Sequence, residues 1–150
     1  MLLTGTFARS IDEKLRVAIP KRLLEPLGCT ALGVLYVAPG TDGSLAIYAE
    51  GAIDELAGRL AQASPTQREV RDFTRLFYAR AQRVQLDRQG RVRIPAPLAE
   101  LAQLGKAKEV VILGVQDHVE LWASDRWEAY LAERQARYDE IAEAAFGGSG

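Results

Sequence analysis

The sequence has 150 residues but only one cysteine, Cys29, and one histidine, His118. A single cysteine cannot form a disulfide within the chain, which suits a reducing compartment such as the cytoplasm. Neither residue has a second histidine or cysteine nearby, so the usual composition of a zinc site is missing. We therefore interpret Cys29 as a buried, unreactive thiol and His118 as a surface turn residue, and we predict no metal and no cofactor.

Long apolar segments are also missing. No run of apolar residues approaches the roughly 18 that a membrane-spanning helix needs, and residues 1–7 are too short and lack the basic flank of a secretion signal. The chain contains no P-loop, GxGxxG, HExxH or CxxC pattern, and its carboxylates do not form an isolated pair in an apolar setting. These absences argue against an enzyme, a small-molecule substrate and a membrane partner.

A ten-residue motif occurs twice in the chain. The second copy, residues 86–95, reads LDRQGRVRIP, and the first, residues 11–20, reads IDEKLRVAIP. Both continue into a helix-compatible run, and residues 45–49 and 119–123 form a second pair of similar segments. Two such units fill the chain, which indicates a tandem duplication rather than a solenoid of three or more repeats.

Each motif is typical of a strand, a tight turn, a second strand and a short helix. Asp12 and Asp87 head the turns, where an aspartate can accept backbone N–H groups two residues further on. Gly90 supplies a positive φ at little steric cost, but the first copy has Leu15 at that position, and leucine resists positive φ. We therefore expect the first turn either to differ in geometry or to carry strain.

The remaining elements follow from hydrophobic periodicity and helix-capping residues. Ser64 is predicted to cap a linking helix, and Ser124 to cap a last helix near 20 residues long. The expected strands are residues 2–10, 33–38, 45–48, 109–113 and 119–122, with a turn at residues 39–44 that joins the strands at 33–38 and 45–48. The other expected helices are residues 21–26 and 53–61. We divide the chain into a first unit at 1–63, a linking helix at 64–79, a second unit at 80–146 and a flexible tail at 147–150.

The net charge is only −1, which argues weakly against DNA binding, but the basic residues are clustered. Residues 80–97 hold five arginines against Asp87 alone, and residues 1–28 are also rich in lysine and arginine, while the compensating acids lie mainly near the C-terminus. Clustered charge is typical of a phosphate-binding face. Charge alone leaves open the alternative of a solvated surface with local ion pairs.

The motif Asp-x-x-Gly-Arg-Val-x-Ile-Pro resembles that of the AbrB-like, swapped-hairpin transcription factors. Two copies in one chain of this size resemble the MraZ family, regulators at the head of bacterial division and cell-wall gene clusters, as do residues 64–71 and 120–122. The resemblance implies an α+β fold of tandem AbrB-like swapped-hairpin β-barrel units in pseudo-two-fold relation, with helices around them.

The same resemblance implies a function and partners. It implies a nucleoid-associated repressor that binds double-stranded DNA at short direct repeats upstream of its own gene, as a homo-oligomeric ring. The family usually has glycine where this chain has Leu15, and that difference puts the equivalence of the two loops in question.

The resemblance also implies that the loop arginines, here Arg16 and Arg91, contact DNA. Arginine can bond bidentately to guanine or phosphate, and a two-stranded β-element can enter the major groove. Secondary candidates for phosphate contacts are Lys14, Arg88, Arg93, Arg9, Lys21 and Arg22, while Asp12, Asp87 and Gly90 are assigned to shaping the turns. The competing interpretation is that each arginine pairs with the aspartate of its own turn and merely holds the loop. Two rival functions remain open. One is an antitoxin-like or scaffold module that binds another protein, and the other is an enzyme whose catalytic residues do not form a recognisable motif.

Overall fold

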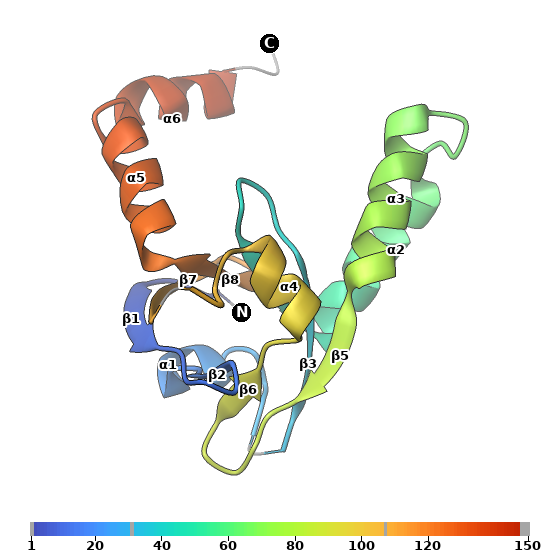
Figure 1. Cartoon of the computed structure of the whole chain (residues 1–150). Helices are drawn as coiled ribbons and strands as arrows, with labels where there is room; N and C mark the ends of the chain where they lie inside the picture. The colour runs from blue at the N-terminus through green and yellow to red at the C-terminus, as the bar shows by residue number, and fades with distance from the viewer. Residues whose placement is uncertain (1, 31, 107, 148–150) are drawn as a thin grey trace.

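The computed structural model describes residues 2–30, 32–106 and 108–147 of the chain. The strands are β1 (Thr6–Ser10), β2 (Arg16–Ala18), β3 (Val34–Pro39), β4 (Leu45–Ala49), β5 (Gln82–Gln85), β6 (Arg91–Arg93), β7 (Glu109–Val115) and β8 (His118–Ala123). The helices are α1 (Lys21–Leu24), α2 (Glu50–Gln62), α3 (Arg68–Arg80), α4 (Ala96–Leu101), α5 (Ser124–Gln135) and α6 (Tyr138–Gly147). The chain is therefore a mixed α+β protein, as predicted (Figure 1).

Six strands form one antiparallel sheet in the order β1-β7-β8-β4-β3-β5, and β2 and β6 form a separate antiparallel pair. Strands from the two halves of the chain pair with each other in both sheets. β1 pairs with β7, β5 pairs with β3, and β2 pairs with β6. The N-terminal and C-terminal halves therefore share their sheets and interlock.

The predicted turn between the third and fourth strands is confirmed. Gly40 donates its N–H to the carbonyl of Ser44 at 3.0 Å, and Asp42 and Gly43 both adopt a positive φ. The flanking strands are apolar on both faces, which predicts burial on both sides. β4 and β8 occupy the middle of the sheet, and Leu45, Ile47 and Leu121 are fully buried there.

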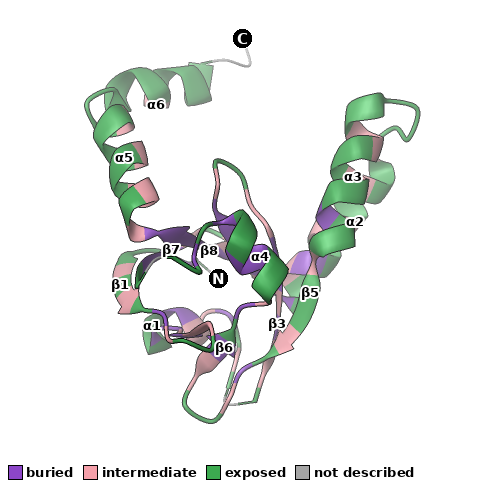
Figure 2. Ribbon diagram, in the orientation of Figure 1, coloured by how far each residue is buried: buried purple, intermediate pink, exposed green. Residues whose placement is uncertain are grey.

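Burial is concentrated in the sheet, the β2–β6 pair and α4 (Figure 2). The main core joins residues of both halves, among them Val17, Leu35, Ile47, Leu86, Val92, Leu98, Ile112 and Leu121. The largest of these side chains bury area worth about 1.5–3 kcal/mol each. Figure 1 shows four of the helices as two arms, α2 with α3 and α5 with α6, which project from the sheet on the side opposite to the β2–β6 pair, whereas α1 lies beside that pair.

Ser64 does not cap the linking helix. Its Oγ lies 2.7 Å from Oγ1 of Thr66, and the N–H of Gln67 donates to its carbonyl, so residues 64–67 form a turn ahead of the helix. Arg71 stabilises this turn by donating from Nη1 to the carbonyls of Pro65 and Thr66, both at 3.0 Å. The helix therefore begins at Arg68 and ends at Arg80.

The predicted last helix is two helices. Arg137 donates its N–H to the carbonyl of Arg134, three residues back, and this tighter turn ends α5 before α6 begins at Tyr138. Ala123, not Ser124, is the N-cap of α5, and Ser124 is its first helical residue. Gly147 ends α6, and the rest of the predicted tail, residues 148–150, lies outside the described residues.

Three smaller expectations are also corrected. The first strand begins at Thr6 rather than residue 2, because Leu3 makes only an isolated bridge to Gln116. His118 is the first residue of β8 rather than part of the turn. Cys29 is partly buried rather than buried, and this desolvation raises the pKa of its thiol.

Candidate nucleic-acid interface

The first motif forms a loop built on Asp12. Its Oδ1 accepts the backbone N–H groups of Lys14 at 2.9 Å and Arg16 at 2.8 Å. Its backbone N–H donates to the carbonyl of Arg16 at 3.2 Å, and its carbonyl accepts the N–H of Leu15 at 3.0 Å. The aspartate thus shapes the turn from both its side chain and its backbone.

The second motif repeats this geometry bond for bond. Oδ1 of Asp87 accepts the N–H groups of Gln89 at 2.8 Å and Arg91 at 2.9 Å. The backbone bonds from Asp87 to Arg91 and from Gly90 to Asp87 measure 2.9 and 3.1 Å. The two loops are therefore equivalent in backbone geometry.

Leu15 adopts the conformation that its sequence disfavours. Its φ is 62°, close to the 75° of Gly90 at the corresponding position of the second loop. A non-glycine residue in this left-handed region costs roughly 1–2 kcal/mol. Of the two outcomes expected for the first turn, the structure has the one in which the geometry is kept and Leu15 carries strain.

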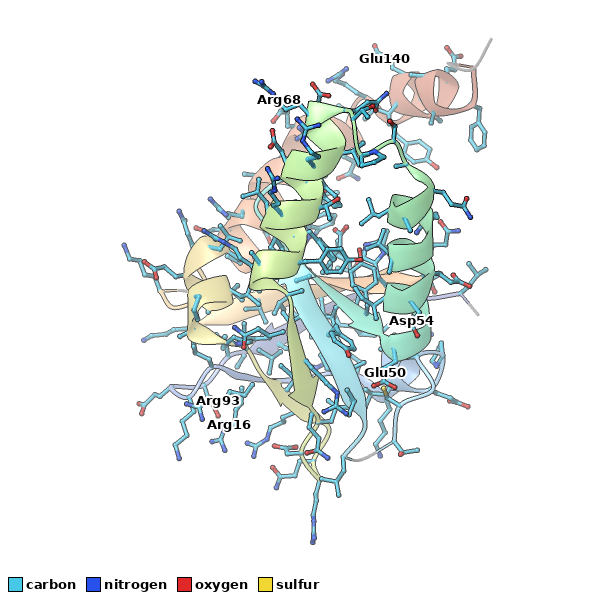
Figure 3. The ribbon with its side chains drawn as sticks, turned by 90° about the vertical axis from the view of Figure 1, so that its right-hand side faces the viewer. Arg16, Glu50, Asp54, Arg68, Arg93 and Glu140 are labelled. Atoms are coloured by element: carbon cyan, nitrogen blue, oxygen red, sulfur yellow. The ribbon has the colours of Figure 1, made fainter. Side chains whose placement is uncertain are left out.

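The two loops are joined by the β2–β6 pair. Val17 lies opposite Val92 and both are fully buried, so the alternation of a strand places Arg16, Arg91 and Arg93 on the outward face. Arg16 lies directly opposite Arg93 in the strand register. Figure 3 shows the two arginines close together at one end of the molecule. Like charges directly opposite each other destabilise a strand pair, so this face stores unfavourable charge that a polyanion would neutralise.

Each loop arginine also forms an ion pair with its own aspartate. Nε of Arg16 lies 2.7 Å from Oδ2 of Asp12, and Nε of Arg91 lies 2.9 Å from Oδ2 of Asp87. The backbone N–H of the arginine, its side-chain bond and its charge together hold the pKa of each aspartate below its ordinary value. Within the described chain only Nε of each guanidinium is bonded, so the Nη groups remain available to a ligand.

Two of the secondary candidates are brought together. Lys21, from the start of α1, and Arg88, from the second loop, line one hollow of about 360 Å³ together with Gly90. A Cβ at Gly90 would lie 3.4 Å from Cδ1 of Leu24 in α1. The helix that follows the first loop is therefore packed against the second loop, and its cation extends the same basic surface.

The other candidates are more scattered. Lys14 is exposed at the tip of the first loop, and Arg22 is exposed on α1. Arg9 lies on β1, where its guanidinium is 5.7 Å from the ring centre of Phe7 and donates to the carbonyl of Ala8. None of these three makes an ion pair with another described residue.

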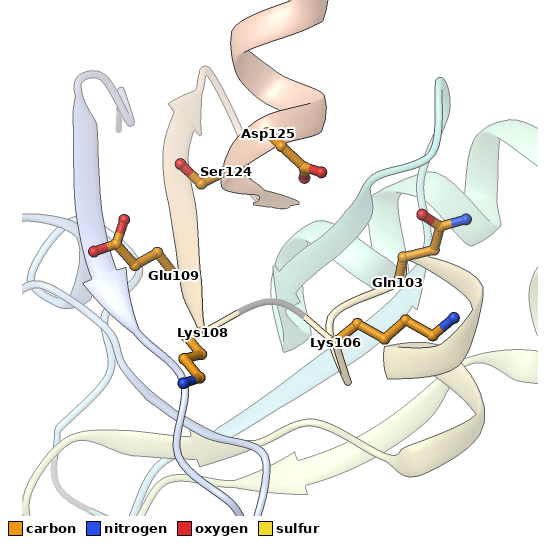
Figure 4. Close-up of a pocket in the computed structure, with 6 residues that line it drawn as sticks. All are labelled: Gln103, Lys106, Lys108, Glu109, Ser124 and Asp125. Carbon is orange, nitrogen blue, oxygen red and sulfur yellow. The ribbon is translucent and has the colours of Figure 1, made fainter.

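Sequence reasoning missed Lys108. Its carbonyl accepts the N–H of Ile11, directly before Asp12, so this exposed lysine stands beside the first loop. The nearby Lys106 was the available signal, but nothing in the sequence placed the pair next to residue 12. Figure 4 shows both lysines at a hollow of about 530 Å³ that also contains Glu109 and Asp125, so its charges are mixed.

The rest of the described chain offers no comparable chemistry. Within residues 2–30, 32–106 and 108–147, no three histidine, cysteine or acidic side chains are grouped so as to hold a metal ion. In the same residues, no helix has the length and apolar character needed to cross a membrane. The paired Asp–Arg loops are therefore the candidate functional site.

Comparison with known proteins identifies the class. The chain is 36% identical over 142 residues to the transcriptional regulator MraZ of Moorella thermoacetica, with 95% of each chain covered. It is 38% identical over 141 residues to that of Alkaliphilus oremlandii, with 94% of each covered, and 38% identical over 142 residues to that of Pelotomaculum thermopropionicum, covering 95% of this chain and 94% of the relative. A family model described as "MraZ protein, putative antitoxin-like" matches residues 77–148.

A mixed α+β chain that carries paired Asp–Arg loops is thus similar in sequence, over nearly its whole length, to proteins named as transcriptional regulators. The chain belongs to the MraZ family. This confirms the resemblance found in the repeated motif, and it places the protein among transcriptional regulators.

Proposed function

We propose that the protein binds DNA sequence-specifically and represses a cell-division and cell-wall gene cluster that includes its own gene. Arg16 and Arg91 contact the operator from the two loops. The flanking cations, Lys14, Arg88, Arg93, Arg9, Lys21 and Arg22, contact phosphates, and Lys108 joins them. The protein acts in the cytoplasm, associated with the nucleoid.

The observation that carries this proposal is the arrangement of arginines on the β2–β6 pair. Arg16 and Arg93 face each other across the strands, and Arg91 leaves the second loop on the same outward face. A two-stranded β-ribbon fits the major groove, and arginine is the side chain that most often reads guanine there. The two loops, which match in backbone geometry, would place two such arginines at a fixed separation.

The ion pairs with Asp12 and Asp87 do not oppose this role. Each pair uses Nε and leaves the two Nη groups, which are the part of a guanidinium that bonds bidentately. The pairs are also partly exposed, with 34% of the Arg16 side chain and 31% of the Arg91 side chain accessible. An aspartate that holds Nε fixes the direction of the guanidinium, which reduces the entropy lost on binding.

We further propose that the chain consists of two AbrB-like units, at residues 1–63 and 80–146, joined by the segment at 64–79, which contains most of α3. The matching loops at Asp12 and Asp87 and the exchange of strands between halves support a swapped arrangement of duplicated units. Several copies in a ring would present the loops to short direct repeats, and joined modules gain avidity without new contact types.

Fluorescence anisotropy of the protein on its own upstream DNA, with scrambled DNA as the control, tests the proposal at about 50 and 200 mM salt. Preference for the native sequence should persist at the higher salt. Replacing both Arg16 and Arg91 by alanine should weaken native binding by about 100-fold or more while the fold is retained. Equal affinity for both DNAs, or unchanged affinity in the double variant, would contradict it.

A second candidate function is an antitoxin-like or scaffold module that binds another protein. The description of the matching family model as antitoxin-like favours it. Co-purification of a stoichiometric protein partner, together with no preference for the native DNA, would support this candidate over the first.

A further inference from the structure

An apolar groove of about 510 Å³ lies on the side of the molecule that carries the helical arms. It is formed by α3, the β3–β4 turn, α4 and the start of α5. Phe73 and Leu76 from α3 and Leu101 from α4 line it, and all three are exposed, Leu76 by 66%. Phe73 stacks on the buried Phe77 at 5.4 Å, which fixes this wall. Adjacent exposed apolar side chains of this kind mark an interaction surface.

The groove is basic as well as apolar. Arg80 and Arg126 line it, and none of the described residues that line it carries a carboxylate. Arg126 donates from Nη1 to the carbonyl of Gly43 at 3.1 Å, and this bond holds its guanidinium at the groove. Neither arginine forms an ion pair with a described residue, so the matching ligand combines apolar side chains with negative charge.

Helix α6 has these properties. At 100° per residue, Tyr138, Ile141, Ala145 and Phe146 fall on one apolar stripe, and the acidic residues fall on the remaining surface. The stripe is uncovered, since Phe146 is 89% exposed and Tyr138 and Ile141 are also exposed. Figure 1 shows α6 at the outer end of the α5 arm, away from the sheet.

The acidic side of α6 is only partly neutralised within the chain. Glu140 lies 3.4 Å from Nε of Arg137, but Asp139 and Glu143 form no ion pair with a described residue. These two residues are four apart and therefore neighbours on the helix surface. Two unpaired carboxylates beside an apolar stripe complement two unpaired arginines beside an apolar groove.

We propose that α6 of one copy of the chain docks into the groove of a second copy. This proposal rests on the self-association included in the proposed function, and it specifies which surfaces of two chains meet. Within one chain, α5 spans about 18 Å, so α6 starts that far from Arg126, at the opposite end of the same helix. Because helix and groove are different surfaces, the contact is heterologous, and its repetition closes into a ring or extends as a filament.

Charge reversal in the full-length protein tests the contact. One variant carries Arg80→Glu and Arg126→Glu in the groove, and the other carries Asp139→Lys and Glu143→Lys on α6. Each variant alone presents like charges at every contact, so its self-association should weaken by about tenfold or more in sedimentation velocity. In an equimolar mixture every helix of one variant matches the groove of the other, and assembly should return.

Circular dichroism and thermal unfolding verify that both variants are folded. If loss of the bond to Gly43 unfolds the groove variant, Arg126→Gln replaces Arg126→Glu. Restoration on mixing establishes contact between chains, because α6 docked in its own groove would gain nothing from a partner. Wild-type protein that is monomeric, folded variants that assemble like the wild type, or a mixture that stays dissociated would each overturn the proposal. Mass is measured without DNA, so these results are distinguishable from failure of the loop arginines to bind an operator.

Discussion

The backbone N–H of Ile94 donates a 2.8 Å hydrogen bond to the carbonyl of Leu15, and the reciprocal bond from Ile19 to Gly90 measures 3.0 Å. The left-handed residue of each loop therefore turns its carbonyl toward the other half of the chain. A backbone hydrogen bond contributes about 0.5–1.5 kcal/mol, so this bond offsets part of the strain of a leucine with positive φ and helps the first loop to keep its geometry. The two loops are held as one unit.

The left-handed position of the second loop should be sensitive to a single methyl group. Gly90→Ala places a Cβ on a residue with φ of 75°, and we expect the free energy of unfolding to fall by about 1 kcal/mol. Gly58→Ala in the exposed middle of α2 is the control, because its Cβ meets no atom within 4 Å and alanine favours a helix. That variant should gain about 0.5–1 kcal/mol in the same urea titration. Equal effects of the two substitutions would remove backbone conformation as the cause.

Removing the turn aspartate should weaken operator binding despite removing a negative charge. Asp87→Ala leaves the N–H groups of Gln89 and Arg91 without their acceptor, so the loop loses its shape and Arg91 its direction. Coulombic attraction alone predicts the opposite result, tighter binding to phosphate. Glu13→Ala is the matched control, since this exposed acid of the first loop makes no hydrogen bond within the described chain, and its loss should leave affinity equal or higher. Tighter binding by Asp87→Ala in anisotropy titrations would show that loop shape does not matter.

The loops were predictable because their chemistry is local. Aspartate at the head, a residue with positive φ and an arginine after it define the turn within five positions, and the predicted hairpin at residues 39–44 is equally local. Alternation also indicates which face of β2 and β6 is buried, as Val17 and Val92 confirm. Hydrophobic pattern fixes the face of a strand but does not identify its partner.

The position of Arg16 opposite Arg93 was not predictable for this reason. It arises only because β2 pairs with β6 and not with a strand of its own half. β6 belongs to the second copy of the motif, which begins 75 residues after the first copy. The meeting of Lys21 with Arg88 has the same origin. The break at Arg137 escaped prediction because no glycine or proline stands there and the apolar stripe continues through it.

The stability of the protein should fall as the pH rises past neutrality, because of His118. Its hydrogen bonds to Glu120 at 3.3 Å and Asp117 at 2.9 Å raise its pKa, and this effect exceeds the opposing effect of burial against Tyr48. A raised pKa means that protonated His118 stabilises the fold. The contribution is fully present below the ordinary value of 6.5 and is lost as the pH rises through the folded pKa.

Urea titrations between about pH 5.5 and 8.5 measure this dependence, with His118→Gln as the comparison, because glutamine does not titrate in that range. The wild type should lose stability with rising pH while the variant stays nearly level. The same pH profile in wild type and His118→Gln would assign the titration to another group.

The arginine opposite Arg16 should act through phosphate rather than through a base. Arg93 is exposed, stands at the end of β6 rather than in the loop, and faces the charge of Arg16 across the strands. Arg93→Ala should therefore weaken binding to native and scrambled DNA alike, and it should reduce the slope of log affinity against log salt by about 1 for each protomer in contact. Arg68→Ala is the matched control, because this arginine lies at the opposite end of the molecule from Arg16 and Arg93 (Figure 3).

Both variants change the net charge equally, so a difference between them measures position and not total charge. Removing Arg93 also relieves its repulsion with Arg16, and the free protein should become slightly more stable as it binds DNA less tightly. This opposite movement of stability and affinity is expected of a residue kept for a ligand. An unchanged salt slope would exclude a phosphate contact at Arg93, and a loss confined to native DNA would make it a base-reading residue, extending sequence recognition from the loops onto the β2–β6 pair itself.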